Sequence, residues 1–252
     1  MNIQLIRHAA LWLEYAGVKL LIDPMFSNTG ENPPIPGSAN ERCNPLVPLP
    51  SGMEAWLQPD AVLVTHMHPD HWDQAAAAAL SKSVPVLCQP GDEETIRDAG
   101  FTSVTAIDTA LAFKGVTIAR TGGQHGTGEI GQRMGHVSGF VFKAANEPTL
   151  YVAGDTIWCG EVSRALDAHR PAFTVVNAGG ARFAVGDPIT MDVDDVVSLV
   201  QYAPYTKVIA VHMDTINHCL VTRADLQKSL EVRGLLGQVA IPGDGEWITE
   251  AL

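Results

Sequence analysis

Short runs of apolar residues recur along the chain, often with polar residues alternating between them, and this pattern predicts strands. The first 23 residues read as a hairpin, in which IQLIRHAALWLEY forms one strand, Ala16-Gly17 the turn and VKLLID the return. Further strands are predicted at the apolar runs DAVLVT, SVPVLC, VTIART, HVSGFVFKA, TLYVAG, AFTVVNA and KVIAVH.

Helical segments alternate with these runs in the rest of the chain. They are predicted to begin near Asp73 (QAAAAAL), Asp92 (EETIRDAG), Cys159 (GEVSRALDAH), Asp192 (VDDVVSLVQYA) and Thr222 (RADLQKSLEVRG). Aspartate and threonine are favoured N-cap residues, because their side chains accept hydrogen bonds from the free N–H groups of the first turn. Strands that alternate with helices predict an α/β fold, with layered sheets covered by helices.

The segment 24–59 interrupts this alternation. It holds eight prolines and follows neither a helical nor a strand-like pattern. A structureless segment of this length inside a compact domain is usually functional, as a lid or a binding wall. The strand before it is too short to be a domain of its own. We therefore predict a single domain over residues 1–252 with a Pro-rich insertion at about 24–59.

Composition narrows the function classes. The chain has 252 residues and a net charge of −12, which disfavours a broad nucleic-acid surface, since phosphate binding needs many lysines and arginines. The N-terminus alternates in polarity, so neither a signal peptide nor a membrane span is predicted. Four widely spaced cysteines without a CxxC motif indicate reduced thiols. We expect a cytoplasmic protein that acts on a small molecule and has no integral membrane association. The oligomeric state is not readable from this pattern.

Four of the predicted strands end in side chains that bind metals. A ligand placed just after a strand lies at the mouth of a sheet, where loops converge on a site. In the extended stretch HMHPDH, the first two histidines point the same way, and Pro69 then turns the chain. The candidate metal ligands are His66, His68, Asp70 and His71 after the first of these strands, His125 after the second, Asp155 after the third and His212 after the fourth.

Imidazole and carboxylate groups together suit Zn²⁺, with Mn²⁺ and Fe as alternatives. On these seven residues the sequence resembles the metallo-β-lactamase-fold superfamily of dinuclear metallohydrolases. The resemblance implies an αββα sandwich of two mixed sheets flanked by helices, with two divalent metal ions. By this resemblance one ion takes His66, His68 and His125, the second takes Asp70, His71 and His212, and Asp155 bridges both.

A closer likeness is to the branch that contains N-acylphosphatidylethanolamine phospholipase D and the ascorbate-6-phosphate lactonases. Those proteins begin with a GHAT-like strand and have a "DP" after the hairpin. Here RHAA (7–10) and IDPMFS (22–27) stand in those places. The sequence departs from the branch pattern at Arg7, where glycine is expected, and at Ala10, where threonine is expected.

The predicted reaction is hydrolysis by a hydroxide that bridges the two metal ions and attacks the carbonyl of a lactone, ester or amide. Asp70 and Asp155 hold the metals and the nucleophile, and His218 is a candidate leaving-group acid or substrate contact. The alternative is a phosphodiester of a small molecule or lipid, for which Arg42, Arg133 and Arg182 are available. A further alternative is an iron-dependent oxidoreductase. A non-catalytic relative is disfavoured, because all seven ligands are present.

Other residues keep two interpretations open. His136 competes with His125 as a ligand, and His8 lies either at the metal floor or in the core. GTGEIG (126–131) matches a dinucleotide motif but precedes a predicted strand, so we interpret it as a flexible loop beside His125. NAGGARF (177–183) is either an anion site or a tight turn. Asp23 and Thr65 are candidates for orienting the imidazoles, and Trp72, Trp158 and Phe183 for lining the pocket.

Overall fold

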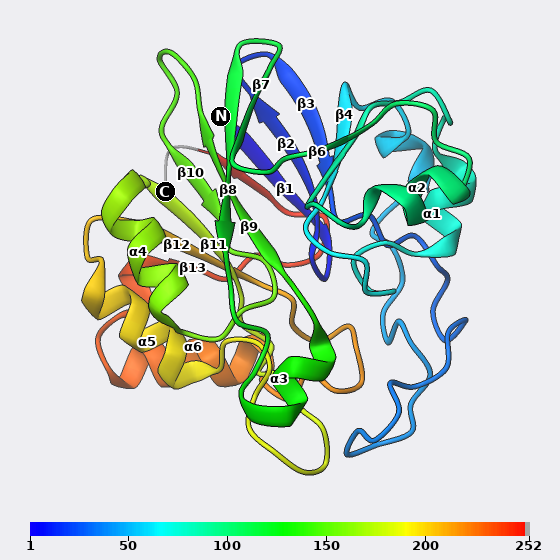
Figure 1. Cartoon of the computed structure of the whole chain (residues 1–252). Coiled ribbons are helices and arrows are strands. Elements are labelled where there is room, and N and C mark those ends of the chain that lie inside the picture. The colour runs from blue at the N-terminus through cyan, green and yellow to red at the C-terminus, as the bar shows by residue number, and fades with distance from the viewer. Residues whose placement is uncertain (250–252) are drawn as a thin grey trace.

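Two seven-stranded sheets lie face to face in the computed structural model, which describes residues 1–249 (Figure 1). The first sheet has the order β14-β1-β2-β3-β4-β5-β6 and the second the order β13-β12-β11-β10-β9-β8-β7. The strands of the first sheet are β1 (Asn2–Arg7), β2 (Ala10–Tyr15), β3 (Val18–Ile22), β4 (Ala61–Val64), β5 (Val86–Cys88), β6 (Val104–Ala106) and β14 (Trp247–Thr249). Those of the second are β7 (Ala110–Phe113), β8 (Val116–Gly122), β9 (Ser138–Lys143), β10 (Leu150–Val152), β11 (Phe173–Asn177), β12 (Lys207–Val211) and β13 (Val239–Ala240).

Both sheets are mixed. In the first, β14, β1, β2 and β3 pair antiparallel, whereas β3, β4, β5 and β6 pair parallel. In the second, β7 to β10 pair antiparallel and β10 to β13 pair parallel. The carboxyl ends of the parallel strands within each sheet therefore lie at one edge of that sheet, where loops can gather.

Helices cover the outer face of each sheet (Figure 1). They are α1 (Gln74–Ala79) and α2 (Glu93–Asp98) on the first sheet, and α4 (Gly160–His169), α5 (Val193–Tyr202) and α6 (Arg223–Val232) on the second. The remaining helices are α3 (Gly128–Met134) and the 3₁₀ turns η1 (Met53–Trp56) and η2 (Leu236–Gln238). The predicted αββα sandwich is confirmed. No helix in the described part of the chain has the length and apolar character needed to cross a membrane.

Alternating side chains of each strand divide the core into three layers. The central layer joins residues such as Leu5, Leu13 and Leu20 of the first sheet to Phe140 and Val175 of the second. The strand neighbours of these residues point outward and pack against the helices. Each fully buried large apolar side chain stabilises the fold by about 1.5–3 kcal/mol. Burial of every second side chain between the sheets therefore stabilises their packing.

The five helices predicted from the sequence begin at the predicted residues, with Asp73, Asp92, Cys159, Asp192 and Thr222 at the N-caps. The Asp73 carboxylate accepts a hydrogen bond from the backbone N–H of Ala76, and Asp192 accepts from two N–H groups of its helix. Thr222 and Asp225 form a reciprocal capping box. Side-chain hydrogen bonds thus explain the starts at Asp73, Asp192 and Thr222, whereas the side chains of Asp92 and Cys159 make no cap hydrogen bond.

Two predictions for local structure were wrong. The run IQLIRHAALWLEY is not one strand, because the chain turns at His8, where φ is 61°, and returns as β2. The loop expected over GTGEIG is in part the helix α3. Gly131 explains this packing, because a Cβ there would lie 2.5 Å from the carbonyl oxygen of Gly126. The glycines permit a tight helical turn. The sequence prediction missed this helix because it treated the glycines only as a possible dinucleotide motif or a loop.

The Pro-rich segment 24–59 contains η1 as its only helix among the described residues and no strand longer than a single bridge. It extends past the sheet ends on the same side of the molecule as α3 (Figure 1). Buried Arg7 holds it by donating hydrogen bonds to the carbonyl oxygens of Met25 (3.0 Å), Ser27 (2.9 Å) and Val47 (3.0 Å). That it is an insertion in one domain stays a prediction, and residues 250–252 of the predicted domain lie outside the described residues.

Candidate metal centre

All seven predicted ligands lie together where their strands end. Four of them follow β4, and one each follows β8, β10 and β12. These seven residues and His8 each offer one ligand atom. The eight atoms form two groups of four, and within each group the atoms lie within 4.8 Å of one another. The first group is His66, His68, His125 and Asp155, and the second is His8, Asp70, His71 and His212.

Asp155 lies between the two groups. Its Oδ2 is 3.4 Å from Nε2 of His125 in the first group and 3.3 Å from Nε2 of His71 in the second. Its Oδ1 is 3.3 Å from Nε2 of His212. One carboxylate therefore faces imidazoles of both groups, as a residue that bridges two metal ions must.

Two imidazoles of the first group, those of His66 and His125, have a partner on their Nδ1 atom, whereas Nδ1 of His68 lies 3.0 Å from Nε2 of His66. Nδ1 of His125 donates to the backbone oxygen of Ile189 at 2.7 Å, which leaves Nε2 free to face Asp155. Nδ1 of His66 lies 3.0 Å from the Thr65 hydroxyl. Partners of this kind fix the ring orientation and tautomer of a metal-binding histidine.

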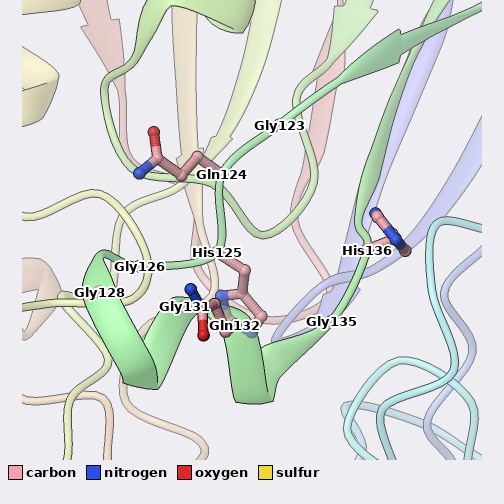
Figure 2. Close-up of a pocket in the computed structure, with 9 residues that line it drawn as sticks. All are labelled: Gly123, Gln124, His125, Gly126, Gly128, Gly131, Gln132, Gly135 and His136. Carbon is pink, nitrogen blue, oxygen red and sulfur yellow. The ribbon is translucent and has the colours of Figure 1, made fainter.

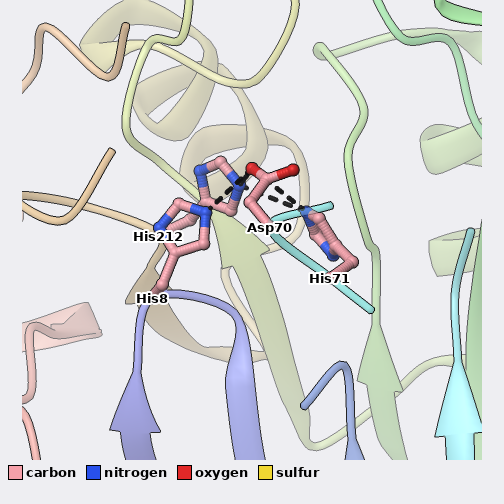
Figure 3. Close-up of side chains that lie close together, drawn as sticks. All are labelled: His8, Asp70, His71 and His212. Atoms are coloured by element: carbon pink, nitrogen blue, oxygen red, sulfur yellow. Dashed lines mark hydrogen bonds and ion pairs between the residues drawn. The ribbon is translucent and has the colours of Figure 1, made fainter. Parts of the chain in front are cut away.

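In the second group the Asp70 carboxylate lies among three imidazoles (Figure 3). Its Oδ2 is 3.1 Å from Nε2 of His8, 3.6 Å from that of His212 and 3.9 Å from that of His71. His8 and His212 stack, with ring centroids 3.6 Å apart. His8 therefore lies beside the candidate ligands of the second group, and the turn at the end of β1 places it there.

Asp23 connects the ligands of the two groups. Its carboxylate accepts hydrogen bonds from Nδ1 of His71 (2.8 Å) and from the backbone N–H (2.7 Å) and hydroxyl (2.8 Å) of Thr65. Asn177 donates to Oδ1 of Asp155 at 2.6 Å. Asp23 and Thr65 were named from the sequence as orienting residues. Asn177 was not, although it too ends an apolar strand.

Burial and neighbouring charges act in opposite directions on the pKa values of Asp155 and His71. Burial raises the pKa of the Asp155 carboxyl, but the imidazoles of His212 and His71 outweigh burial and hold the pKa well below its usual range. Burial alone would lower the pKa of His71, but the carboxylates of Asp155 and Asp23 raise it well above its ordinary value. Burial keeps the pKa of His66 well below its ordinary value. Metals bind neutral imidazoles and ionised carboxylates, so a metal ion at His71 would displace the proton that the carboxylates favour there.

The residues fit a pair of metal ions. Nε2 of His71 and Nε2 of His212 face each other at 3.3 Å. Two such nitrogens need a proton or a cation between them, since their lone pairs repel each other otherwise. Nitrogen and carboxylate oxygen donors suit Zn²⁺ and related divalent ions, and the ligands other than the half-buried His68 are buried.

A cavity of about 140 Å³ opens over the two groups. His68, Asp70, His125, Asp155 and His218 contribute polar side chains to its lining. Its apolar walls are Ile35, Met134, Phe183 and Ile189. The buried Nδ1 of His218 has no hydrogen-bond partner, and burial lowers the pKa of His218 to about 4. An unpartnered neutral imidazole thus lies beside the two carboxylates.

Several other candidates lie away from the ligand groups. His136 is exposed and lines a cavity of about 550 Å³ that His125 also lines (Figure 2). His136 precedes β9, whereas His125 follows β8, and only His125 belongs to a ligand group. Trp72 packs against Phe101 and Trp158 against Tyr202, so Phe183 alone of the three aromatic candidates lines the cavity over the ligands.

The NAGGARF turn is explained by close packing. A Cβ at Gly179 would lie 2.2 Å from the carbonyl oxygen of His212, so glycine lets the two strand ends approach each other. Arg182 lines a different cavity, together with Asp192 and Asp194. The turn therefore supports the position of His212.

Comparisons with known proteins agree with this geometry. The sequence model of the Beta-lactamase superfamily domain matches residues 19–213. The UPF0173 protein YddR of Bacillus subtilis (strain 168) is 37% identical over 254 residues, which cover 99% of this chain and 100% of YddR. A UPF0173 metal-dependent hydrolase of Azorhizobium caulinodans is 28% identical over 74% of this chain and 76% of its own.

A solved structure matches as well. The crystal structure of isothiocyanate hydrolase from Delia radicum gut bacteria superposes with a TM-score of 0.95 and 37% identity, and the match covers 99% of each chain. The likeness to the branch with N-acylphosphatidylethanolamine phospholipase D stays a prediction. From its family model and its UPF0173 relatives, the chain belongs to the beta-lactamase superfamily, within the UPF0173 metal-dependent hydrolases.

Proposed function

We propose that the chain is a dinuclear metal-dependent hydrolase of small uncharged molecules with an electrophilic carbon, and that isothiocyanates are the substrate class to test first. Carbonyl compounds such as lactones, esters and amides share the required chemistry and are the next class. The proposal rests on the two ligand groups, joined by Asp155, at the floor of a cavity of about 140 Å³.

The single observation that favours an uncharged substrate is the cavity wall. Among the described residues, this lining contains no lysine or arginine. A phosphodiester would need such cations to offset its charge. Arg42 and Arg133 are exposed, and Arg182 lines another cavity, so the arginines that would support phosphodiester cleavage do not line this one.

The similar solved structure adds chemical detail. That protein is named isothiocyanate hydrolase and shares 37% of its residues with this chain. The central carbon of an isothiocyanate, R–N=C=S, lies between nitrogen and sulfur and is electrophilic. Addition of water across C=N gives a thiocarbamic acid, whose C–N bond then breaks to release the amine and carbonyl sulfide. The products balance one substrate molecule and one water.

The residues would divide the work as follows. His66, His68 and His125 hold one ion, Asp70, His71 and His212 the other, and Asp155 contacts both. Bound divalent ions supply Lewis acidity and make ionised water available near neutral pH. Asp70 and Asp155 accept the hydrogen bonds that orient the attacking water. His218 lines the same cavity, where its imidazole would contact the substrate nitrogen.

The test is a substrate panel with protein loaded with Zn²⁺ or, separately, with Mn²⁺. We expect benzyl isothiocyanate to be converted to benzylamine, and an activated phosphodiester to be turned over at least about 100-fold more slowly, because the cavity offers no cation to it. Amine release is measured by chromatography, with chelator-treated protein as the control. Faster cleavage of the phosphodiester, or equal amine release after chelation, would contradict the proposal.

His218 gives a second test of the site. Replacing His218 by phenylalanine keeps a planar ring but removes its hydrogen-bonding nitrogens. We expect kcat to fall about 10²-fold, within the range for loss of one positioned hydrogen bond to the reacting group, while two metals stay bound. Rates and metal content are measured on the same preparation. An unchanged kcat would exclude a role for His218 in the reaction.

A further inference from the structure

A second cavity lies beside the metal cavity. It has a volume of about 310 Å³ and shares Ile35, Pro69 and Asp70 with the cavity over the ligands. The two cavities are therefore adjacent across one common wall. A substrate with its reactive group over the metal ligands would reach the second space past Ile35 and Pro69 at this shared edge.

The walls of this second cavity are apolar. Met25, Pro33, Pro34, Pro36 and Ile216 line it, with Ile35 and Pro69 at the shared edge. Asp70 is the one charged side chain among the described lining residues, and it belongs to the second ligand group.

The polar group of Asn44 is occupied by other partners. Its Nδ2 donates to Oδ1 of Asn217 at 2.9 Å, and its Oδ1 accepts from the backbone N–H of Asn217 at 2.8 Å. Asn32 is a further polar lining residue, so the cavity presents mostly hydrocarbon to its occupant, and no lysine or arginine among the described residues lines it to compensate an anion for lost hydration.

The Pro-rich wall is held in place from both sides. Asn217 binds it through the Asn44 hydrogen bonds and by accepting from the backbone N–H of Ile35 at 3.0 Å. Arg7 binds the backbone on either side of this stretch, at Ser27 and Val47. Proline restricts the backbone further. A wall fixed in this way is pre-formed, and pre-formed apolar cavities are the usual form of small-molecule sites.

We propose that this cavity, lined by Met25, Pro33, Pro34, Pro36 and Ile216, is the subsite for the hydrocarbon tail of the substrate. The inference rests on the proposed function and narrows its substrate class to electrophiles that carry an aryl or medium-length alkyl group. An apolar cavity of about 150 Å³ is enough for a benzene ring. The larger volume here accommodates a benzyl group, whereas a methyl group would leave it unfilled.

The kinetic test compares benzyl and methyl isothiocyanate in two matched variants. Pro33 and Pro48 are both exposed, but only Pro33 lines the cavity, so Pro33→Glu adds a carboxylate at its wall and Pro48→Glu makes the same change away from both cavities. We expect Pro33→Glu to lower kcat/KM for benzyl isothiocyanate at least about tenfold and to leave that for methyl isothiocyanate unchanged. Equal losses for both substrates, or equal effects of both variants, would overturn the subsite.

A binding measurement separates this inference from the proposed reaction. The methyl group of Met25 reports on the second cavity and that of Met134 on the metal cavity, and both can be followed by ¹³C NMR. We expect unreactive benzyl alcohol to shift the Met25 signal saturably in the wild type and in Pro48→Glu, but not in Pro33→Glu. Absence of that shift in the wild type overturns the subsite. A shift without turnover of any isothiocyanate supports the subsite and contradicts the proposed reaction.

Discussion

Replacing Asp155 by alanine is expected to abolish turnover and to lower the metal content of the protein. Its carboxylate faces His125 at 3.4 Å and His71 at 3.3 Å, so its removal leaves both ligand groups without their common acceptor. Removing one partner from a buried charged cluster costs about 3–5 kcal/mol, or roughly a 10²–10⁴-fold change in an equilibrium constant. We expect kcat/KM to fall by at least that factor, as measured with benzyl isothiocyanate.

Two further variants control this result. Asp108→Ala removes a carboxylate that is 86% exposed, and it should leave metal content and rate unchanged. Asp155→Asn keeps the shape and one oxygen but removes the charge, and it should retain the fold while losing most of the activity. If Asp155→Ala binds metal and turns over substrate like the wild type, the bridging assignment is wrong.

Replacing Asp23 by alanine is expected to weaken metal binding although Asp23 is outside both ligand groups. Three hydrogen bonds end on its buried carboxylate, one from His71 and two from Thr65. Loss of such an orienting partner typically lowers metal affinity about 10–100-fold. Each buried donor left without a partner also costs about 1–3 kcal/mol, so Tm should fall by several degrees.

Metal affinity is measured by competition with a chromophoric chelator, and Tm by calorimetry. Asp23→Asn retains one carbonyl oxygen as an acceptor and should lose less affinity than Asp23→Ala. A merely structural role predicts a lower Tm at unchanged metal affinity, and that outcome would contradict the role assigned here. The separate readouts therefore distinguish orientation of His71 from general support of the fold.

The clustering of the seven candidate ligands was predictable because these residues obey a local rule. Each follows an apolar run, and parallel strands bring the ends of such runs to one edge of a sheet. The N-caps of the main helices were predictable for a similar reason, since a cap acts within its own first turn. Asn177 follows the same strand-end rule, and a closer reading of AFTVVNA could have found it.

The turn at His8 could not be predicted from the alternation of polar and apolar residues. Polarity in IQLIRHAALWLEY is compatible with one continuous strand, and the positive φ of His8 leaves no trace in that alternation. The short edge strands β6, β7, β13 and β14 were likewise missed, because a few residues give too little period to read. Helix α3 was hidden among glycines, which have low helix propensity.

The pocket walls were the least predictable part. The walls of the second cavity come mostly from the Pro-rich segment, whose position depends on hydrogen bonds with Arg7 and Asn217, residues outside it in sequence. Tertiary contacts of this kind are not encoded in any local periodicity. The proposed substrate class rests on these walls, whereas the candidate ligands follow from strand ends, so the sequence located the ligand groups but not the cavity walls.

The central claim is a pair of metal ions held by two ligand groups with Asp155 between them. Its most direct test is the metal content of the purified wild type after loading with Zn²⁺ and removal of excess ion, measured by inductively coupled plasma mass spectrometry against protein concentration. The geometry predicts two ions per chain in the wild type and fewer in Asp155→Ala. One ion per chain, or none, in fully folded wild-type protein would contradict the dinuclear site.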